Sequence, residues 1–156
     1  MRLYLETTMF NYYFDAAREG HEDTVRLFEA IGAGIHEGYT SAYVQIELQD
    51  APEPKQSQML ALIQQYGIRV LETSKEADRL ADVYIQHGII PERFRFDSTH
   101  IACASVYGLD YVLSYNFRHI NRAKTKLLTE RVNRNEGYGS VIICTAKEAL
   151  EDEQPN

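Results

Sequence analysis

Three acidic residues and one amide in this chain occur at places where side chains can gather to do chemistry. Glu6 directly follows an apolar run, Glu47 lies in a short apolar segment, and Asp97 opens a segment rich in small residues. Asn116 follows the apolar run 111–115. If the apolar runs are neighbouring strands of one parallel sheet, these four side chains meet at its carboxyl edge, where open α/β sheets bind their ligands.

Carboxylates that lie close together repel one another, so they stay ionised only when cations are near. Oxygen ligands of this kind suit Mg²⁺ or Mn²⁺. An ion held by Glu6, Glu47 and Asp97 lowers the pKa of a bound water and polarises a phosphoryl oxygen. The set therefore indicates metal-dependent phosphodiester chemistry, with these three acids as metal ligands and Asn116 as a fourth catalytic residue.

Each acid also has a purely structural explanation. Asp97 can cap the helix that it opens. Glu47 can lie at the margin of a helix, and Glu6 can be a strand-end acid in solvent. Among the other acids, Asp50 and, less strongly, Asp15 could assist the site.

The elements that must position these residues follow from hydrophobic periodicity. Apolar runs predict strands at 3–5, 39–41, 68–71, 111–114 and 141–144. Amphipathic segments predict helices at 9–17, 22–35, 42–49, 56–66, 74–86, 97–107, 118–134 and 146–150. Strands that alternate with helices predict an α/β fold with a mostly parallel central sheet.

Length and composition fit one domain. The chain has 156 residues, of which 44% are hydrophobic, and we expect a single domain over 1–150 with an acidic, frayed tail over 151–156. The amino terminus does not have the pattern of a signal peptide, and no apolar stretch approaches the about 20 residues of a membrane span. Cys103 and Cys144 are expected to be buried thiols, typical of a reducing cytoplasm.

The net charge of −7 argues against non-specific nucleic-acid binding, but the charge is unevenly distributed. Six basic residues occur within 117–134 against one acid, Glu130: Arg118, Arg122, Lys124, Lys126, Arg131 and Arg134. They form either the solvated face of a helix or a strip that contacts phosphates.

Four segments of the chain resemble PIN domains. Leu3–Thr8, Thr40–Glu47, Asp97–Ala104 and Val112–Ile120 occur in the order seen in that family, and the pattern is similar to the VapC-type toxin branch. The resemblance covers almost the whole chain. It implies a Rossmann-like, three-layer α/β/α sandwich, Mg²⁺ or Mn²⁺ bound by acids, and endonucleolytic cleavage of RNA. It also implies a homodimer in the cytoplasm and a cognate antitoxin protein as partner.

Carried over to this sequence, the resemblance puts Glu6 where the family usually has its first Asp. Glu47 falls on the helix acid, Asp97 on the third acid, and Asn116 where a fourth acid is usual. Glu6 is one methylene longer than Asp, and Asn116 leaves the site with three charges rather than four. Fewer anionic ligands weaken a second metal more than the first, and the amide is also compatible with lost catalysis.

Further residues are weighed beside this set. Thr7 and Ser114 fall on small hydroxyl positions of the family pattern. His100 is expected to be packed or hydrogen-bonded, and His119 to lie at the surface or to contact phosphate. RNA is expected along Arg118, Arg122, Lys124 and Lys126. Aromatic residues near the site could stack on bases, although core or interface packing is the commoner role: Tyr12, Tyr13, Phe14 and Tyr43.

Two other functions remain compatible with the sequence. A PIN-like domain without catalysis would act as an RNA- or protein-binding module, and metal affinity separates it from a nuclease. A receiver-type phosphotransfer protein also has an acidic pocket, but it needs an acceptor Asp at the strand end where this chain has Glu6.

Overall fold

The computed structural model, which describes residues 1–152, is built on a sheet of five parallel strands in the order β3-β2-β1-β4-β5. The strands are β1 (Arg2–Leu5), β2 (Glu37–Ser41), β3 (Arg69–Leu71), β4 (Tyr111–Leu113) and β5 (Ile142–Cys144). Each forms close to its predicted place. Because β1 is the middle strand, the residue that follows it is delivered to the centre of the carboxyl edge.

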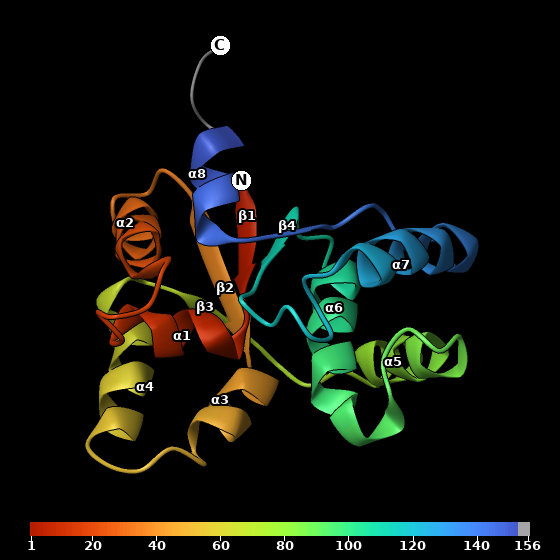
Figure 1. Ribbon diagram of the computed structural model, residues 1–156. Coiled ribbons are helices and arrows are strands. Elements are labelled where there is room, and N and C mark those ends of the chain that lie inside the picture. Colours follow the sequence, from red (N-terminus) through yellow and green to blue (C-terminus); the bar gives the residue numbers. More distant parts are fainter. Residues whose placement is uncertain (153–156) are drawn as a thin grey trace.

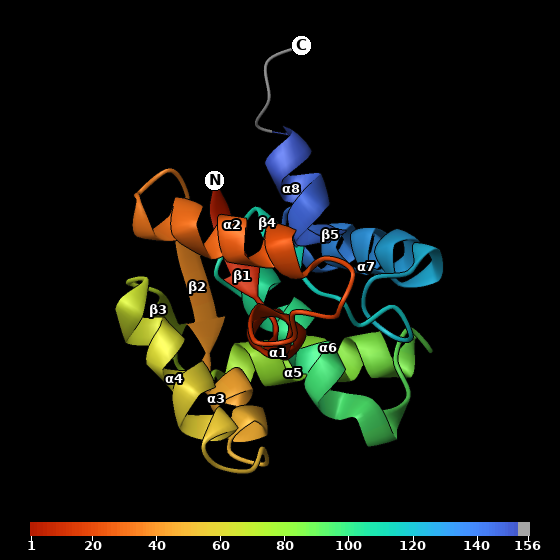
Figure 2. The same ribbon diagram turned by 60° about the vertical axis from the view of Figure 1, so that its left-hand side comes forward.

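Helices cover both faces of the sheet. They are α1 (Thr7–Tyr13), α2 (His21–Gly32), α3 (Ala42–Leu48), α4 (Lys55–Gln65), α5 (Lys75–Gln86), α6 (Arg95–Val106), α7 (Ala123–Glu136) and α8 (Ala146–Asp152). Figure 1 shows α1 and α2 on one side of the central strands and α5, α6 and α7 on the other, with α3 and α4 below the sheet. The view in Figure 2 agrees with this layering, which confirms the predicted α/β sandwich.

The core lies between these layers. Leu3, Tyr4 and Leu5 of β1 are all 0% exposed, as expected for a parallel strand covered on both faces. Both cysteines are free and buried, and burial raises the pKa of each thiol to about 12. Small residues along α6 let this helix lie close to the sheet and to α5.

Several helices begin a few residues from their predicted starts, and two of these differences bear on the site. A short 3₁₀ turn, η1 (Glu92–Phe94), precedes α6, which starts at Arg95. Asp97 therefore lies inside the first turn, and the predicted cap is wrong: the N-cap residue is Phe94, without a side-chain cap. The carboxyl of Asp97 interacts instead with the Asn116 amide and the His100 ring.

The basic helix α7 begins at Ala123 rather than at 118. The intervening residues stay close to the end of β4, because the Asn121 amide N–H donates to the Asn116 carbonyl at 2.8 Å. The Asn121 side chain donates to the Ser114 carbonyl at 3.0 Å. These bonds hold Arg118 in a loop beside the carboxyl edge of the sheet.

Helix α8 extends through Asp152, so Glu151 and Asp152 of the predicted tail belong to a helix. The rest of that tail, 153–156, lies outside the described residues. Within residues 1–152, no helix has the length and apolar character needed to cross a membrane.

Candidate active site

Glu6 lies at the end of β1, where it is also the N-cap residue of α1. Its side chain is only 2% exposed. One carboxylate oxygen accepts hydrogen bonds from Thr8 Oγ1 and from Ser114 Oγ, each at 2.6 Å. Burial raises the pKa of Glu6, while the positive charge of His100 and these two hydroxyls act in the opposite direction. A buried acid with two donors on one oxygen is held in a fixed position.

Glu47 faces the same region from α3. Its Oε1 accepts a hydrogen bond from Thr7 Oγ1 at 2.9 Å and interacts closely with His100 Nε2. Burial would raise the pKa of Glu47, but His100 and Thr7 lower it below its ordinary value. The carboxylate is therefore ionised near neutral pH.

His100 connects Glu47 to the interior of the protein. It is fully buried, and its Nδ1 lies 2.7 Å from the hydroxyl of Tyr4, which in turn lies 2.7 Å from Ser41 Oγ. Burial lowers the pKa of His100, but three carboxylates outweigh it and the net shift is upward. In its protonated form the ring donates to Glu47 and to Tyr4, and Tyr4 then donates to Ser41. The prediction of a hydrogen-bonded His100 is confirmed.

Asp97 enters the site from the first turn of α6. Burial raises its pKa, while His100 and a hydrogen bond from the Asn116 amide lower it. The Asn116 side-chain oxygen accepts the His119 backbone N–H at 3.0 Å. Asn116 thus donates to the neighbouring acid and also closes the turn that follows β4.

The four predicted residues therefore come together. Glu47 perturbs the pKa of both Glu6 and Asp97, and Asn116 contacts Asp97. With all three carboxylates ionised and His100 protonated, the charges sum to −3 + 1 = −2, which a single divalent cation would balance. The oxygen donors suit Mg²⁺ or Mn²⁺ in chemical type. Within residues 1–152, however, no three acidic, His or Cys side chains are arranged to share an ion, because these oxygens face hydroxyl, imidazole and amide donors instead.

The basic residues divide into two groups. The guanidinium carbon of Arg118 lies 5.5 Å from the centre of the Phe94 ring, on which Arg93 also lies at 5.1 Å. Neither arginine forms an ion pair within the described part of the chain. The His119 ring packs on Phe94 at 4.2 Å, and its Nε2 is buried without a hydrogen-bond partner among residues 1–152.

The other basic residues lie further along the chain. Arg122 is the N-cap residue of α7 and donates to the Arg118 carbonyl at 3.2 Å. Lys124 is exposed in the first turn of α7. Lys126 lines a cavity beside β5 together with three acids, Glu148, Glu151 and Asp152. The predicted strip is therefore not one helix face.

Sequence reasoning missed several residues of this site. Nothing local marks Tyr4 or Ser41 as partners of His100, because these residues are brought together only by the fold. The signal that could have found Tyr4 is its position in the central strand, where a buried hydroxyl needs a partner. Thr8, which donates to Glu6, was likewise not singled out.

Comparison with known proteins identifies a family for this chain. The PIN domain family matches residues 3–125, which include all four predicted site residues. A comparison with curated protein sequences found no match.

Similar folds occur among the solved structures. Mycobacterium tuberculosis VapC20, described as a sarcin-ricin loop cleaving toxin, has a TM-score of 0.59 and 15% identity over 75% of this chain and 92% of its own. VapBC2 from Rickettsia felis, bound to a DNA fragment from their promoter, has a TM-score of 0.56 and 15% identity over 78% of this chain and 94% of its own. At this identity the likeness shows the fold, and the match over residues 3–125 shows the family: the chain belongs to the PIN domain family.

Proposed function

We propose that this protein is a Mg²⁺- or Mn²⁺-dependent endoribonuclease that acts as the toxin of a toxin–antitoxin pair. The observation that carries the proposal is the group of three acids at the carboxyl edge of a parallel sheet, in which Glu6 is buried and Glu47 and Asp97 are half-buried. Three carboxylates are costly to bury without cations. His100 compensates for one charge, and the remaining two fit a divalent ion.

The ion, when bound, would supply a hydroxide nucleophile and polarise the phosphoryl group. The residues of the chain hold its ligands in place. Thr8 and Ser114 fix the Glu6 carboxylate, and Thr7 and His100 fix that of Glu47. Hydrogen bonds of this kind from neighbouring side chains hold metal ligands in the orientation that metal binding and catalysis need.

Arg118 is suited to bind a phosphate beside the scissile one. It directly follows the turn closed by Asn116, and its guanidinium is held against Phe94 without an acidic partner in the described chain. Planar guanidinium groups bind phosphate through paired hydrogen bonds. In the cleavage itself, the oxygen of water bonds to phosphorus, the bond to the leaving ribose oxygen breaks, and that oxygen takes up a proton.

The protein partners proposed here are a cognate antitoxin and a second copy of the chain. VapC-type fold similarity supports both. Size-exclusion chromatography with light scattering would measure the oligomer, and co-expression with the product of a neighbouring reading frame would test for an antitoxin. A cytoplasmic location is part of the same proposal.

The decisive experiment is cleavage of a panel of structured RNAs by the purified protein in Mn²⁺, Mg²⁺ or EDTA. The Asp97→Asn variant removes one charge at the site. The control is Glu37→Gln, which also removes one carboxylate charge but does so at the exposed first residue of β2, at the opposite edge of the sheet from the site. We expect metal-dependent cleavage that Asp97→Asn lowers by at least about 100-fold and Glu37→Gln leaves unchanged.

One observation favours a second candidate function. Because the carboxylates face internal donors and Asn116 donates to Asp97, the domain could bind RNA or protein without catalysis. A folded protein that cleaves none of the RNAs and shows no heat of Mn²⁺ binding in calorimetry would overturn the nuclease proposal in favour of this binding function.

A further inference from the structure

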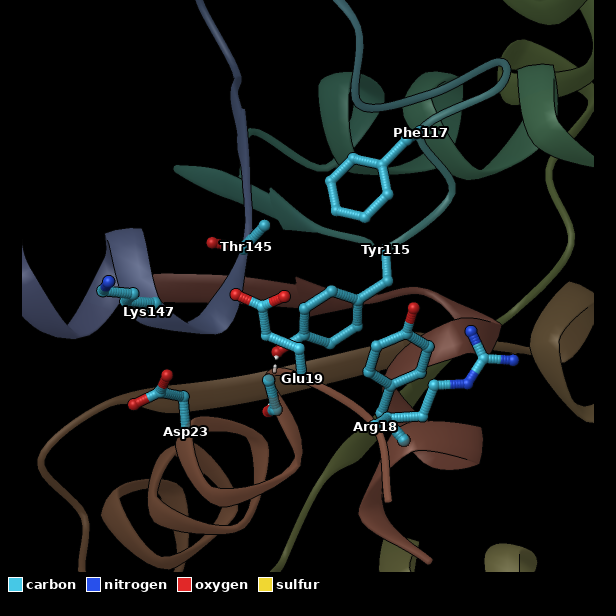
Figure 3. A pocket seen from close by; sticks show the side chains of 9 residues that line it. Arg18, Glu19, Asp23, Tyr115, Phe117, Thr145 and Lys147 are labelled. Carbon is cyan, nitrogen blue, oxygen red and sulfur yellow. Dashed lines mark hydrogen bonds between the residues drawn. The ribbon is translucent and has the colours of Figure 1, made fainter. Parts of the chain in front are cut away.

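A cavity of about 450 Å³ opens beside the carboxylate site. One wall comes from the loop between α1 and α2, and the other from the segments that follow β4 and β5 (Figure 3). Its lining combines aromatic rings with charged side chains: Tyr12, Glu19, Asp23, Tyr115, Phe117 and Lys147.

This cavity is coupled to the candidate active site through Tyr115 and Thr8. The Tyr115 backbone N–H donates to Thr8 Oγ1 at 2.8 Å, and Thr8 donates to the Glu6 carboxylate. A second cavity of about 320 Å³ includes Thr8 and shares Tyr12, Arg18 and Tyr115 with the first. An RNA strand bound at the candidate active site can therefore place its next nucleotide in the larger cavity.

The aromatic rings of the cavity differ in their contacts and in their exposure to solvent. Tyr12 and Tyr115 stack on each other at 3.9 Å with an angle of 3° between their planes, and Arg18 lies over Tyr12 at 5.2 Å. The Tyr115 hydroxyl is 2.7 Å from Thr24 Oγ1, so these two rings form a rigid wall. The Phe117 side chain is 56% exposed. An exposed ring at the mouth of a cavity suits a flat partner, and stacking of a nucleobase on it contributes about 1–3 kcal/mol.

The acids of the cavity decide which part of a nucleotide fits. Figure 3 shows the Glu19 carboxylate beside the Tyr115 ring and the Asp23 carboxylate below it. Glu19 is exposed and has no ion-pair partner in the described chain, and Asp23 has only Arg26 at 3.9 Å. The two cations of the lining are already paired with acids, Arg18 with Asp15 and Lys147 with Glu151. The two carboxylates therefore disfavour a phosphate, but they accept hydrogen bonds from N–H groups. The base, rather than the phosphate, is therefore the part that fits.

Among the four bases, guanine matches a carboxylate best. Its Watson–Crick edge presents two adjacent donors, N1–H and the N2 amino group, which reach both oxygens of one carboxylate. Adenine and cytosine present one amino group beside an acceptor nitrogen, and uracil presents one N–H between two carbonyls. Single-stranded RNA is read by this combination of stacking and hydrogen bonds to base edges.

We infer that this cavity binds an unpaired guanine adjacent to the cleaved phosphodiester, with the base on Phe117 and its donor edge on Glu19. The inference rests on the proposed RNA substrate and adds a base preference to it.

The first test needs no catalysis. NMR spectra of the ¹⁵N-labelled full chain would be titrated in EDTA with GMP, AMP, CMP and UMP. We expect GMP to bind at least about tenfold more tightly than the others, with shifts at Phe117 and in the α1–α2 loop. Glu19→Gln and Phe117→Ala should each weaken GMP binding about tenfold, whereas Glu22→Gln, on the exposed side of α2 outside this cavity, should not.

The second test uses cleavage of short single-stranded RNAs that differ at the nucleotides flanking the cut. Wild-type protein should prefer guanine at one of these positions, Glu19→Gln should lose the preference, and Glu22→Gln should keep both the preference and the rate of the wild type. Equal binding of all four nucleotides, no binding of any, or an unchanged preference in Glu19→Gln would overturn the inference. GMP-selective binding without any RNA cleavage would instead leave the cavity assigned and remove the proposed nuclease.

Discussion

Asn116 is the residue at which this site departs most from a set of four acids. Its amide donates to Asp97, and its oxygen closes the turn at His119. Asn116→Asp keeps the turn acceptor but removes the donor and adds a charge. We expect the metal-free variant to unfold at a lower temperature because two carboxylates then face each other.

The same variant should gain more from Mn²⁺ than the wild type does, since an added anionic ligand strengthens ion binding and binding to the folded state stabilises it. Thermal unfolding with EDTA and with Mn²⁺ measures both effects. Asn135→Asp makes the matching change at an exposed position of α7 and should shift neither. A variant as stable as wild type in EDTA would show that the Asn116 amide does not support Asp97.

The pair of His100 and Glu47 makes stability depend on pH. The pKa of His100 is raised above 6.5, so its contribution is present below pH 6.5 and is lost as pH rises through the folded value. The pKa of Glu47 is lowered below 4.5, so its contribution is present above pH 4.5 and is lost as pH falls through the folded value. The pair stabilises the fold most between these limits.

His100→Gln should therefore lower the free energy of unfolding by about 1–3 kcal/mol at pH 6, because Tyr4 and Glu47 lose a buried partner. The difference from wild type should shrink as pH rises to 9. Urea unfolding at several pH values measures it. A difference that is constant over pH 6–9 would mean that His100 is neutral in the folded protein.

The chemical types at this site could be read from the sequence, but their contacts could not. Glu6 and Asn116 were found because each follows an apolar run, and strand ends share an edge in parallel sheets. The partnership of His100 with Glu47 joins two helices that are far apart in the chain, and the orientation of the Asn116 amide depends on a turn. Neither feature leaves a local pattern.

At the level of elements, the α1–α2 connection depends on Gly20. This residue is the N-cap of α2 with φ of 99°, and a Cβ there would lie 3.1 Å from the Tyr115 ring. Gly20→Ala adds backbone strain of about 1–2 kcal/mol and also presses on that ring. Gly34 has a φ of 79°, but no atom lies within 4 Å of a Cβ added there. Gly34→Ala therefore measures the cost of the backbone strain alone.

We expect Gly20→Ala to lose about 1 kcal/mol or more beyond Gly34→Ala in urea unfolding, because the stacked Tyr12 and Tyr115 must shift. The same shift should weaken GMP binding in the adjacent cavity. Equal losses of unfolding free energy in the two variants would show that the Tyr115 ring moves aside without destabilising the fold.

Strand positions were predicted better than helix starts, for a physical reason. Strand runs are short, apolar and bounded, so β1 and β4 are visible as patterns. The start of α6 depends on the 3₁₀ turn before it, and that of α7 on hydrogen bonds to the end of β4. The periodicity of a basic, polar segment indicates neither the 3₁₀ turn nor these hydrogen bonds. The family resemblance predicts only where the motifs lie in the sequence.

For the molecule as a whole, the net charge of −7 means that RNA affinity must come from local cations. Arg118 lies beside the carboxyl edge without an acidic partner in the described chain, whereas Lys126 shares its surroundings with three acids. An acid beside a cation already neutralises it, so Lys126 has less to gain from a phosphate. The two side chains should therefore differ in their effect on RNA binding.

The salt dependence of binding separates them. Each phosphate contact to single-stranded RNA contributes about 0.7 to the slope of log K against log salt. In the Asp97→Asn background with EDTA, Arg118→Ala should reduce the slope by about that amount, and Lys126→Ala should leave it unchanged. Fluorescence anisotropy of a labelled RNA between 50 and 200 mM salt, about the range over which this effect is large, provides the measurement. If Lys126→Ala reduces the slope as much as Arg118→Ala, the RNA extends from the carboxyl edge along α7 and β5, and the acids beside Lys126 do not keep it from phosphate, since only contacts to phosphate release counterions.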